Sequence, residues 1–91
     1  MEKGNGVKKS IAEALELPKD IILDVPKIIM IGNLQIYIEN HKGILEYTDE
    51  RIRINTKNNV LRIIGKNLIL KNIVMEEIII VGEINQVDFI D

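Results

Sequence analysis

Residues 27–39 read KIIMIGNLQIYIE, two short isoleucine-rich segments joined at Gly32-Asn33. In the second segment apolar and polar residues alternate, so Ile36 and Ile38 point to one side of an extended strand and Tyr37 points to the other. A Gly-Asn pair between two apolar runs is typical of a tight hairpin turn. The stretch therefore predicts two antiparallel strands that turn one face toward a core.

The same pattern continues to the C-terminus. The further segments are ILEYT at 44–48, RIRIN at 51–55, VLRII at 60–64, LILKNIV at 68–74 and EEIIIVGEINQVDFI at 76–90. Residues 40–43 and 65–67 have the composition of longer hairpin loops, and Gly82 predicts a bulge or bend. We expect an all-β fold, a small antiparallel β-sandwich with immunoglobulin-like layers; a small β-barrel or a short β-solenoid is the alternative.

A different composition precedes the strands. Residues 1–9 are polar and glycine-containing, which predicts a flexible N-terminal arm. Residues 10–17 open with the capping box Ser-Ile-Ala-Glu and end before Pro18, as a short helix does. Residues 18–26 hold both prolines and predict an extended segment that leads into the sheet at 27–91. A chain of 91 residues has room for one domain, which we place at 10–91.

Composition excludes several classes of protein. The net charge is −2 with acids and bases interspersed, so no basic surface for nucleic acid is expected. Cysteine is absent, which excludes disulfides, thiolate metal sites and a cysteine nucleophile. No signal peptide is visible, and no apolar run is longer than Ile78 to Val81, which is far too short to span a membrane. We expect a cytoplasmic protein.

Few residues could carry chemistry. His41 is the only histidine, and one imidazole without cysteine cannot build a usual zinc site. Glu76 and Glu77 are adjacent on an extended segment, so their side chains point to opposite faces. We therefore expect no enzyme, no catalytic residue, no cofactor and no metal. The alternative is a ligand-binding or enzymatic domain in which His41, with Glu39 or Asp49, lines a small pocket.

One segment departs from the alternation. Ile78, Ile79, Ile80 and Val81 are apolar on both faces of a strand. Such a strand is either covered on both sides within its own domain or in contact with a partner, so we consider Ile78–Val81 a candidate interaction strand.

The chain resembles the YabP/YqfC family of sporulation proteins, and most closely its YqfC branch. The matching stretches are ELPKD at 16–20, LDVP at 23–26, MIG at 30–32, IYIENHKGI at 36–44, IRIN at 52–55, LRIIG at 61–65, LIL at 68–70 and EEI at 76–78 with Ile80 and Gly82. The most specific of them holds the signature loop Glu39, Asn40, His41, Lys42 and Gly43.

The resemblance implies a small all-β sandwich without enzymatic activity, made during sporulation in the mother cell. We expect it to act in spore formation or spore envelope assembly through protein–protein interaction. The expected partner is another sporulation protein, membrane-associated at the forespore membrane, or a second copy of the chain.

Overall fold

The computed structural model describes residues 24–91, and the six strands in this range form one antiparallel sheet. The strands are β1 (Lys27–Ile31), β2 (Gln35–Glu39), β3 (Ile44–Tyr47), β4 (Arg51–Asn55), β5 (Val60–Val74) and β6 (Glu77–Ile90). Their order in the sheet is β1-β2-β6-β5-β4-β3. The flexible arm expected at 1–9, the helix expected at 10–17 and most of the segment at 18–26 lie outside the described residues.

Short turns of the expected composition connect the edge strands to their neighbours. At the β1–β2 turn Gly32 has φ +53°, and the Leu34 N–H donates to the Ile31 carbonyl at 3.1 Å. At the β3–β4 turn the Thr48 hydroxyl accepts a hydrogen bond from the Arg51 N–H at 2.8 Å. Serine and threonine hydroxyls stabilise turns in this way, so local chemistry determines both hairpins.

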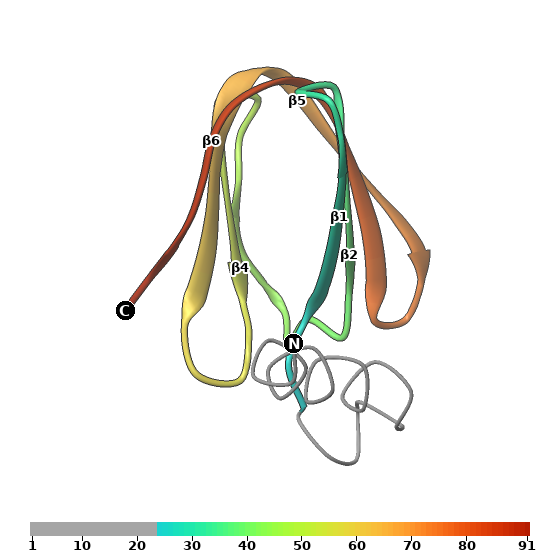
Figure 1. Ribbon diagram of the computed structural model, residues 1–91, viewed down its shortest axis with the longest axis vertical. Coiled ribbons are helices and arrows are strands. Elements are labelled where there is room, and N and C mark those ends of the chain that lie inside the picture. The colour runs from blue at the N-terminus through green and yellow to red at the C-terminus, as the bar shows by residue number, and fades with distance from the viewer. Residues whose placement is uncertain (1–23) are drawn as a thin grey trace, which may run out of the picture.

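The two longest strands bend together and divide the sheet into two layers that face each other (Figure 1). We define the bend as residues 65–68 of β5 and 82–85 of β6, where their register is irregular. The first layer comprises β1, β2 and the β5–β6 hairpin up to the bend, residues 69–81. The second layer comprises β3, β4 and the remaining halves of β5 and β6.

Two glycines make the bend possible. A Cβ atom at Gly65 would lie 2.1 Å from the Glu83 carbonyl oxygen, so no side chain fits there. Gly82 has φ +141°, and a Cβ atom on it would lie 2.7 Å from the Asn67 carbonyl oxygen. The backbones of β5 and β6 therefore approach at the bend as only glycine permits, which confirms the expectation of a bend at Gly82.

The turns of the two edge hairpins hold the bend from either side. The Gly82 and Ile84 N–H groups donate to the carbonyls of Leu34 and Asn33 in the β1–β2 turn, at 3.1 and 2.7 Å. In the same way the Gly65 and Leu68 N–H groups donate to the carbonyls of the β3–β4 turn, at 3.0 and 2.8 Å. The β1–β2 turn thus binds β6, and the β3–β4 turn binds β5. An approximate two-fold axis therefore relates β1, β2 and β6 to β3, β4 and β5.

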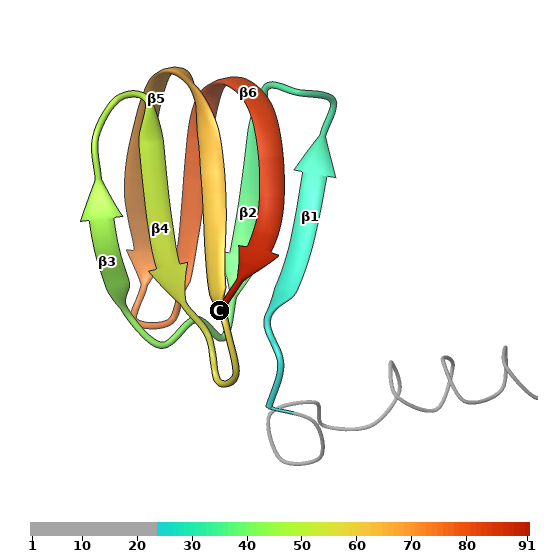
Figure 2. The same ribbon diagram turned by 90° about the vertical axis from the view of Figure 1, so that its left-hand side faces the viewer.

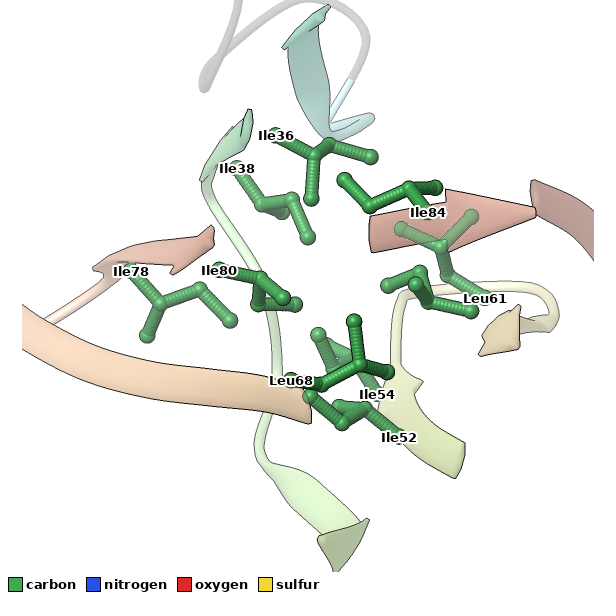
Figure 3. Packing of buried hydrophobic residues seen from close by; sticks show 10 residues of the cluster. Ile36, Ile38, Ile52, Ile54, Leu61, Leu68, Ile78, Ile80 and Ile84 are labelled. Atoms are coloured by element: carbon green, nitrogen blue, oxygen red, sulfur yellow. The ribbon is translucent and has the colours of Figure 1, made fainter. Parts of the chain in front are cut away.

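The core fills the space between the two layers. Its fully or almost fully buried members are Ile36, Ile38, Ile52, Ile54, Leu61, Ile63, Leu68, Ile78, Ile80 and Ile84. Figure 3 shows these side chains converging from both layers, with Leu68 and Ile84 coming from the bend. The alternation in β2 and β4 places their isoleucines inward, as the sequence predicts.

The all-β, antiparallel prediction is confirmed, and two of its details are wrong. Residues 65–67 form no hairpin loop, because β5 continues through them and bends. Residues 40–43 form no hairpin either, because they carry the chain from β2 in the first layer to β3 in the second (Figure 2). Immunoglobulin-like layers are not confirmed, since the described strands belong to one continuous sheet. Every neighbouring pair is antiparallel, unlike the parallel pairing of a β-solenoid.

Candidate interaction site

The signature loop crosses from one layer to the other and is bonded to both. The Asn40 N–H donates to the Glu76 carbonyl at 2.9 Å, in the turn between β5 and β6. The Lys42 N–H donates to the Asn55 carbonyl at 2.7 Å, and the Asn55 N–H donates to the Gly43 carbonyl at 2.8 Å. Gly43 has φ +131°, a conformation that suits glycine. The loop therefore closes the end of the sheet that lies opposite the bend.

Asn40 is the central residue of this loop. It has φ +67°, which asparagine tolerates better than most residues, and it is only 5% exposed. Its amide Nδ2 donates to Asp24 Oδ1 and to the Val25 carbonyl, both at 3.1 Å. Because Asp24 and Val25 directly precede β1, the Asn40 side chain determines where the chain enters the sheet.

The carboxylate of Asp24 lies between two cations. Lys42 Nζ is 2.8 Å from Asp24 Oδ1, and Lys57 Nζ is 3.8 Å from Oδ2. The hydrogen bond from Lys42, followed by the one from Asn40, lowers the pKa of Asp24. These polar contacts link the start of β1 to the β4–β5 turn, so their role in the described residues is structural.

His41 does not build a pocket with the residues proposed for it. Its Nδ1 accepts a hydrogen bond from the Gly43 N–H at 3.0 Å, so the neutral ring carries its proton on Nε2. Nε2 is buried, without a hydrogen-bond partner in residues 24–91. Glu39 lines a hollow of about 410 Å³ beside the β5–β6 turn, and Asp49 lines another of about 480 Å³ beside the β3–β4 turn. His41 lines neither of these two hollows.

Residues 24–91 offer no metal site and no membrane-crossing helix. No group of three or more histidine, aspartate or glutamate side chains in this range is placed to hold a metal ion. In the same range no helix has the length and apolar character needed to cross a bilayer.

The outer surface of the first layer carries an unusual concentration of apolar side chains. Register places six of them on this surface, in two adjacent rows: Ile29, Ile31, Tyr37, Ile69, Ile79 and Val81. We call this set the apolar face. Ile29, Ile31 and Ile69 are 44–58% exposed, and the other three are half-buried. Contiguous apolar groups on a sheet surface are typical of binding sites.

The outer surface of the second layer shows the opposite character. The approximate two-fold axis relates each row of the first layer to a row of the second. The counterparts of Ile29, Tyr37, Ile79 and Lys71 are Glu46, Arg53, Arg62 and Asp88. Glu46 binds Arg53 Nε at 2.8 Å, and Asp88 binds Arg62 at 2.7 and 3.2 Å. In these corresponding rows, the second layer therefore carries ion pairs, whereas the first layer is apolar at three of its four positions.

The candidate strand Ile78–Val81 contributes to both sides of the first layer. Ile78 and Ile80 are buried in the core, while Ile79 and Val81 belong to the apolar face. Because β6 pairs with β2 on one side and β5 on the other, this segment has no free edge. Its role in an interaction remains a prediction, and it concerns the outward side chains alone.

Tyr37 contributes both an aromatic ring and a polar hydroxyl group to the apolar face. Burial and a hydrogen bond to the Glu77 carboxylate, with Glu39 also near, raise the pKa of Tyr37. Its hydroxyl therefore remains protonated at neutral pH and can donate to a carboxylate. Aromatic rings that carry such a polar group are common in protein interfaces.

Comparison with known proteins extends this picture. The family model described as "YabP family" matches residues 24–91, the whole described range. The chain belongs to the YabP family. This YabP-family chain is also 39% identical over 90 residues to a Bacillus subtilis (strain 168) protein named "Uncharacterized protein YqfC", covering 99% of the chain and 97% of that protein. No solved structure matches the chain significantly.

The family resemblance seen in the sequence is thus confirmed, whereas the apolar face could not be found from sequence. Ile29, Tyr37 and Ile69 belong to different strands, and only the register of those strands brings them to one surface. One local signal was available: KIIMI and IIIV are apolar at positions that point away from the core. That signal identified Ile78–Val81 but left its neighbours on the other strands unassigned.

Proposed function

We propose that this YabP-family protein is a non-enzymatic interaction domain that acts in spore formation or spore envelope assembly. It binds another sporulation protein through its apolar face. The sporulation role rests on the resemblance to the YabP/YqfC family of sporulation proteins. The mode of binding rests on one observation, the contrast between the apolar outer surface of the first layer and the ion-paired outer surface of the second.

The physical reason for this role is the cost of leaving apolar side chains in water. Burying an apolar side chain gains roughly 25 cal/mol for each Å² removed from solvent. A partner that covers Ile69, Ile79 and Val81 recovers this free energy, while the ion-paired surface offers no comparable gain. We further propose that the bent sheet acts as a two-layered β-sandwich whose second layer supports the binding layer.

The place of action that fits this role is the cytoplasm of the mother cell. A membrane-associated partner would hold the domain at the forespore membrane, on its periphery. A fluorescent fusion followed through sporulation tests this placement, and signal confined to the forespore interior would contradict it.

A matched pair of variants tests the proposal. Val81 and Ile64 occupy corresponding half-buried positions on the outer surfaces of the first and second layers. We expect Val81→Lys to lower the number of heat-resistant spores and to abolish capture of the partner from sporulating cells, because a desolvated charge would oppose binding. Ile64→Lys should leave both measurements as in the wild type.

One further measurement makes the result interpretable. Urea denaturation of both variants checks that neither substitution unfolds the sheet. If Val81→Lys and Ile64→Lys behave alike in the sporulation assay while both remain folded, the apolar face is not the binding surface.

A further inference from the structure

The two layers end in four strand edges that are paired on one side only. In residues 24–91, β1 pairs with β2 alone and β3 with β4 alone. Residues 69–74 of β5 pair only with β6, and residues 84–90 of β6 pair only with β5. Each such edge presents backbone N–H and C=O groups that a further strand could use.

Three of these edges carry features that oppose strand addition. The β3 edge has a register irregularity between Ile44 and Glu46, and the Glu46 carboxylate binds two arginines. On β5 the Leu70 N–H donates to the Tyr47 hydroxyl at 3.0 Å, and the register is irregular near Asn72. The β6 edge carries Asp88, which is paired with Arg62. Bulges, side-chain caps and charges are the devices that protect sheet edges.

The β1 edge has no bulge and no side-chain cap in residues 24–91, and it carries a charge only at its first residue. Its five residues pair with β2 in regular register, and Lys27 at one end is its only charged residue. Ile29, Met30 and Ile31 are 44%, 44% and 58% exposed. A regular, apolar and exposed edge strand is the arrangement that accepts another strand.

We propose that β1 pairs antiparallel with β1 of a second copy of the chain, so that two sheets join into one. The segment complements itself: with the two-fold axis at Ile29, Ile28 of one copy lies opposite Met30 of the other, and Lys27 lies opposite Ile31. The two lysines are then four residues apart, about 13 Å at the rise of an extended strand, so they do not repel strongly.

The boundaries of β1 limit the pairing to these five residues. Pro26 lacks a backbone donor, and the chain turns away at Gly32. So short a pairing gives a weak dimer, with a dissociation constant above roughly the micromolar range. Ile29 and Ile31 also belong to the apolar face, so the dimer would join the apolar faces of both copies into one band. The proposal goes beyond the proposed function, because the dimer forms through the backbone edge of β1, whereas the other sporulation protein binds the outward side chains of the first layer.

The absence of cysteine allows a direct test with the full chain. Ile29→Cys introduces the only thiol, at the centre of the proposed two-fold axis. Under mild oxidation we expect rapid formation of a covalent dimer. Ile69→Cys on the apolar face and Leu45→Cys on β3, each at a position that is 50% exposed, serve as controls and should cross-link at least 10-fold more slowly. Equal rates at the three positions, or faster cross-linking at Ile69, would overturn the proposal.

Sedimentation equilibrium provides the second measurement. The wild-type chain should change from monomer to dimer as its concentration rises from about 10 µM to about 1 mM, a range chosen for weak interfaces. Met30→Lys should raise the dissociation constant at least 10-fold without lowering the urea midpoint, since Met30 is exposed. A chain that stays monomeric throughout, or a Met30→Lys dimer of unchanged affinity, refutes the pairing. Val81→Lys should dimerise normally, which separates a failure of this proposal from a failure of partner binding.

Discussion

At the scale of single residues, Asn40 shows why the signature loop has its composition. The residue must adopt a positive φ, enter the protein interior and satisfy two acceptors that precede β1. Asparagine meets these requirements together, because its amide donates two hydrogen bonds and its backbone tolerates the left-handed region. Structural requirements at Asn40 therefore explain this part of the composition of the loop.

Substitution of Asn40 separates these contributions. Asn40→Gly removes the side-chain hydrogen bonds but keeps the backbone conformation unstrained, and it should lower the free energy of unfolding by about 1–3 kcal/mol. Asn40→Ala adds the strain of a positive φ and should cost about 1 kcal/mol more. Urea denaturation measures both values. Equal stability of the two variants would show that backbone strain contributes nothing at this position.

The ion pairs of the second layer predict a dependence on pH. Hydrogen bonds from Arg51 and then Arg53 lower the pKa of Glu46 in the folded protein. A carboxylate whose folded pKa lies below its unfolded value, about 4.3, stabilises the fold above that value. This stabilisation is lost as the pH falls through the folded pKa. Glu46→Gln should therefore lower the urea midpoint at pH 7 and flatten its decline in acid.

Glu50 provides the control for this measurement. It lies on the adjacent turn with an exposed side chain, so Glu50→Gln should leave the decline in acid unchanged. A Glu46→Gln profile that parallels the wild type from pH 7 to pH 3 would contradict the assignment.

At the scale of elements, the bend in β5 and β6 decides the architecture. Without it these strands would form one long, flat ribbon with its apolar side chains in water. Gly65 and Gly82 permit the close approach, and the turns of the two hairpins satisfy the N–H groups that the bend releases from the ladder. The bend therefore depends on β5, on β6 and on the turns of both edge hairpins.

Glycine substitutions at the bend should be strongly destabilising. Gly65→Ala brings a methyl group against the Glu83 carbonyl, and Gly82→Ala adds a contact with the Asn67 carbonyl to an unfavourable φ. We expect each to cost about 2–4 kcal/mol, which thermal or urea unfolding detects readily. Gly32→Asn is the control, because nothing lies within 4 Å of its added Cβ and asparagine tolerates a φ of +53°. An unchanged midpoint for Gly65→Ala would refute the steric explanation.

At the scale of the whole molecule, the approximate two-fold symmetry means that the two layers contribute corresponding side chains to the core. Ile80 in the first layer and Ile63 in the second are both fully buried in one shared core. Their outer surfaces, by contrast, differ in the corresponding rows described above, one mostly apolar and the other ion-paired. The symmetry therefore concerns the core, and its breakdown on the outer surfaces is the basis of our proposal that one layer supports and the other binds.

Matched core substitutions test this symmetry. Ile80→Val and Ile63→Val each remove one methylene group from a fully buried side chain, and each should cost about 0.5–1.5 kcal/mol. The two variants should agree within about 0.5 kcal/mol, and the double variant should show the non-additivity expected of residues in one core. Denaturant titration of the four proteins gives these values. A cost several times larger at one site would show that a single layer dominates stability.

Much of the fold could be predicted from the sequence, since alternation and turn composition are local properties. The strands at 27–31 and 51–55 and the hairpin at Gly32-Asn33 were predicted within a residue. The predictions failed at 40–43 and 65–67, where glycine and asparagine were interpreted as hairpin turns. The same residue types serve equally in a crossing between layers or a bend, and only contacts with distant backbone distinguish these uses.

The sequence by itself determined the all-β class, the inward isoleucines, the tight turns and membership of the family, because each depends on neighbouring residues or on similarity along the chain. Only the tertiary structure decided how β5 and β6 bend, which strands become neighbours and which outward residues meet on one surface. These features depend on strand register between segments far apart in the sequence, as in the pairing of Gln35 with Val81. The candidate interaction surface is a property of that register, so it became visible only in three dimensions.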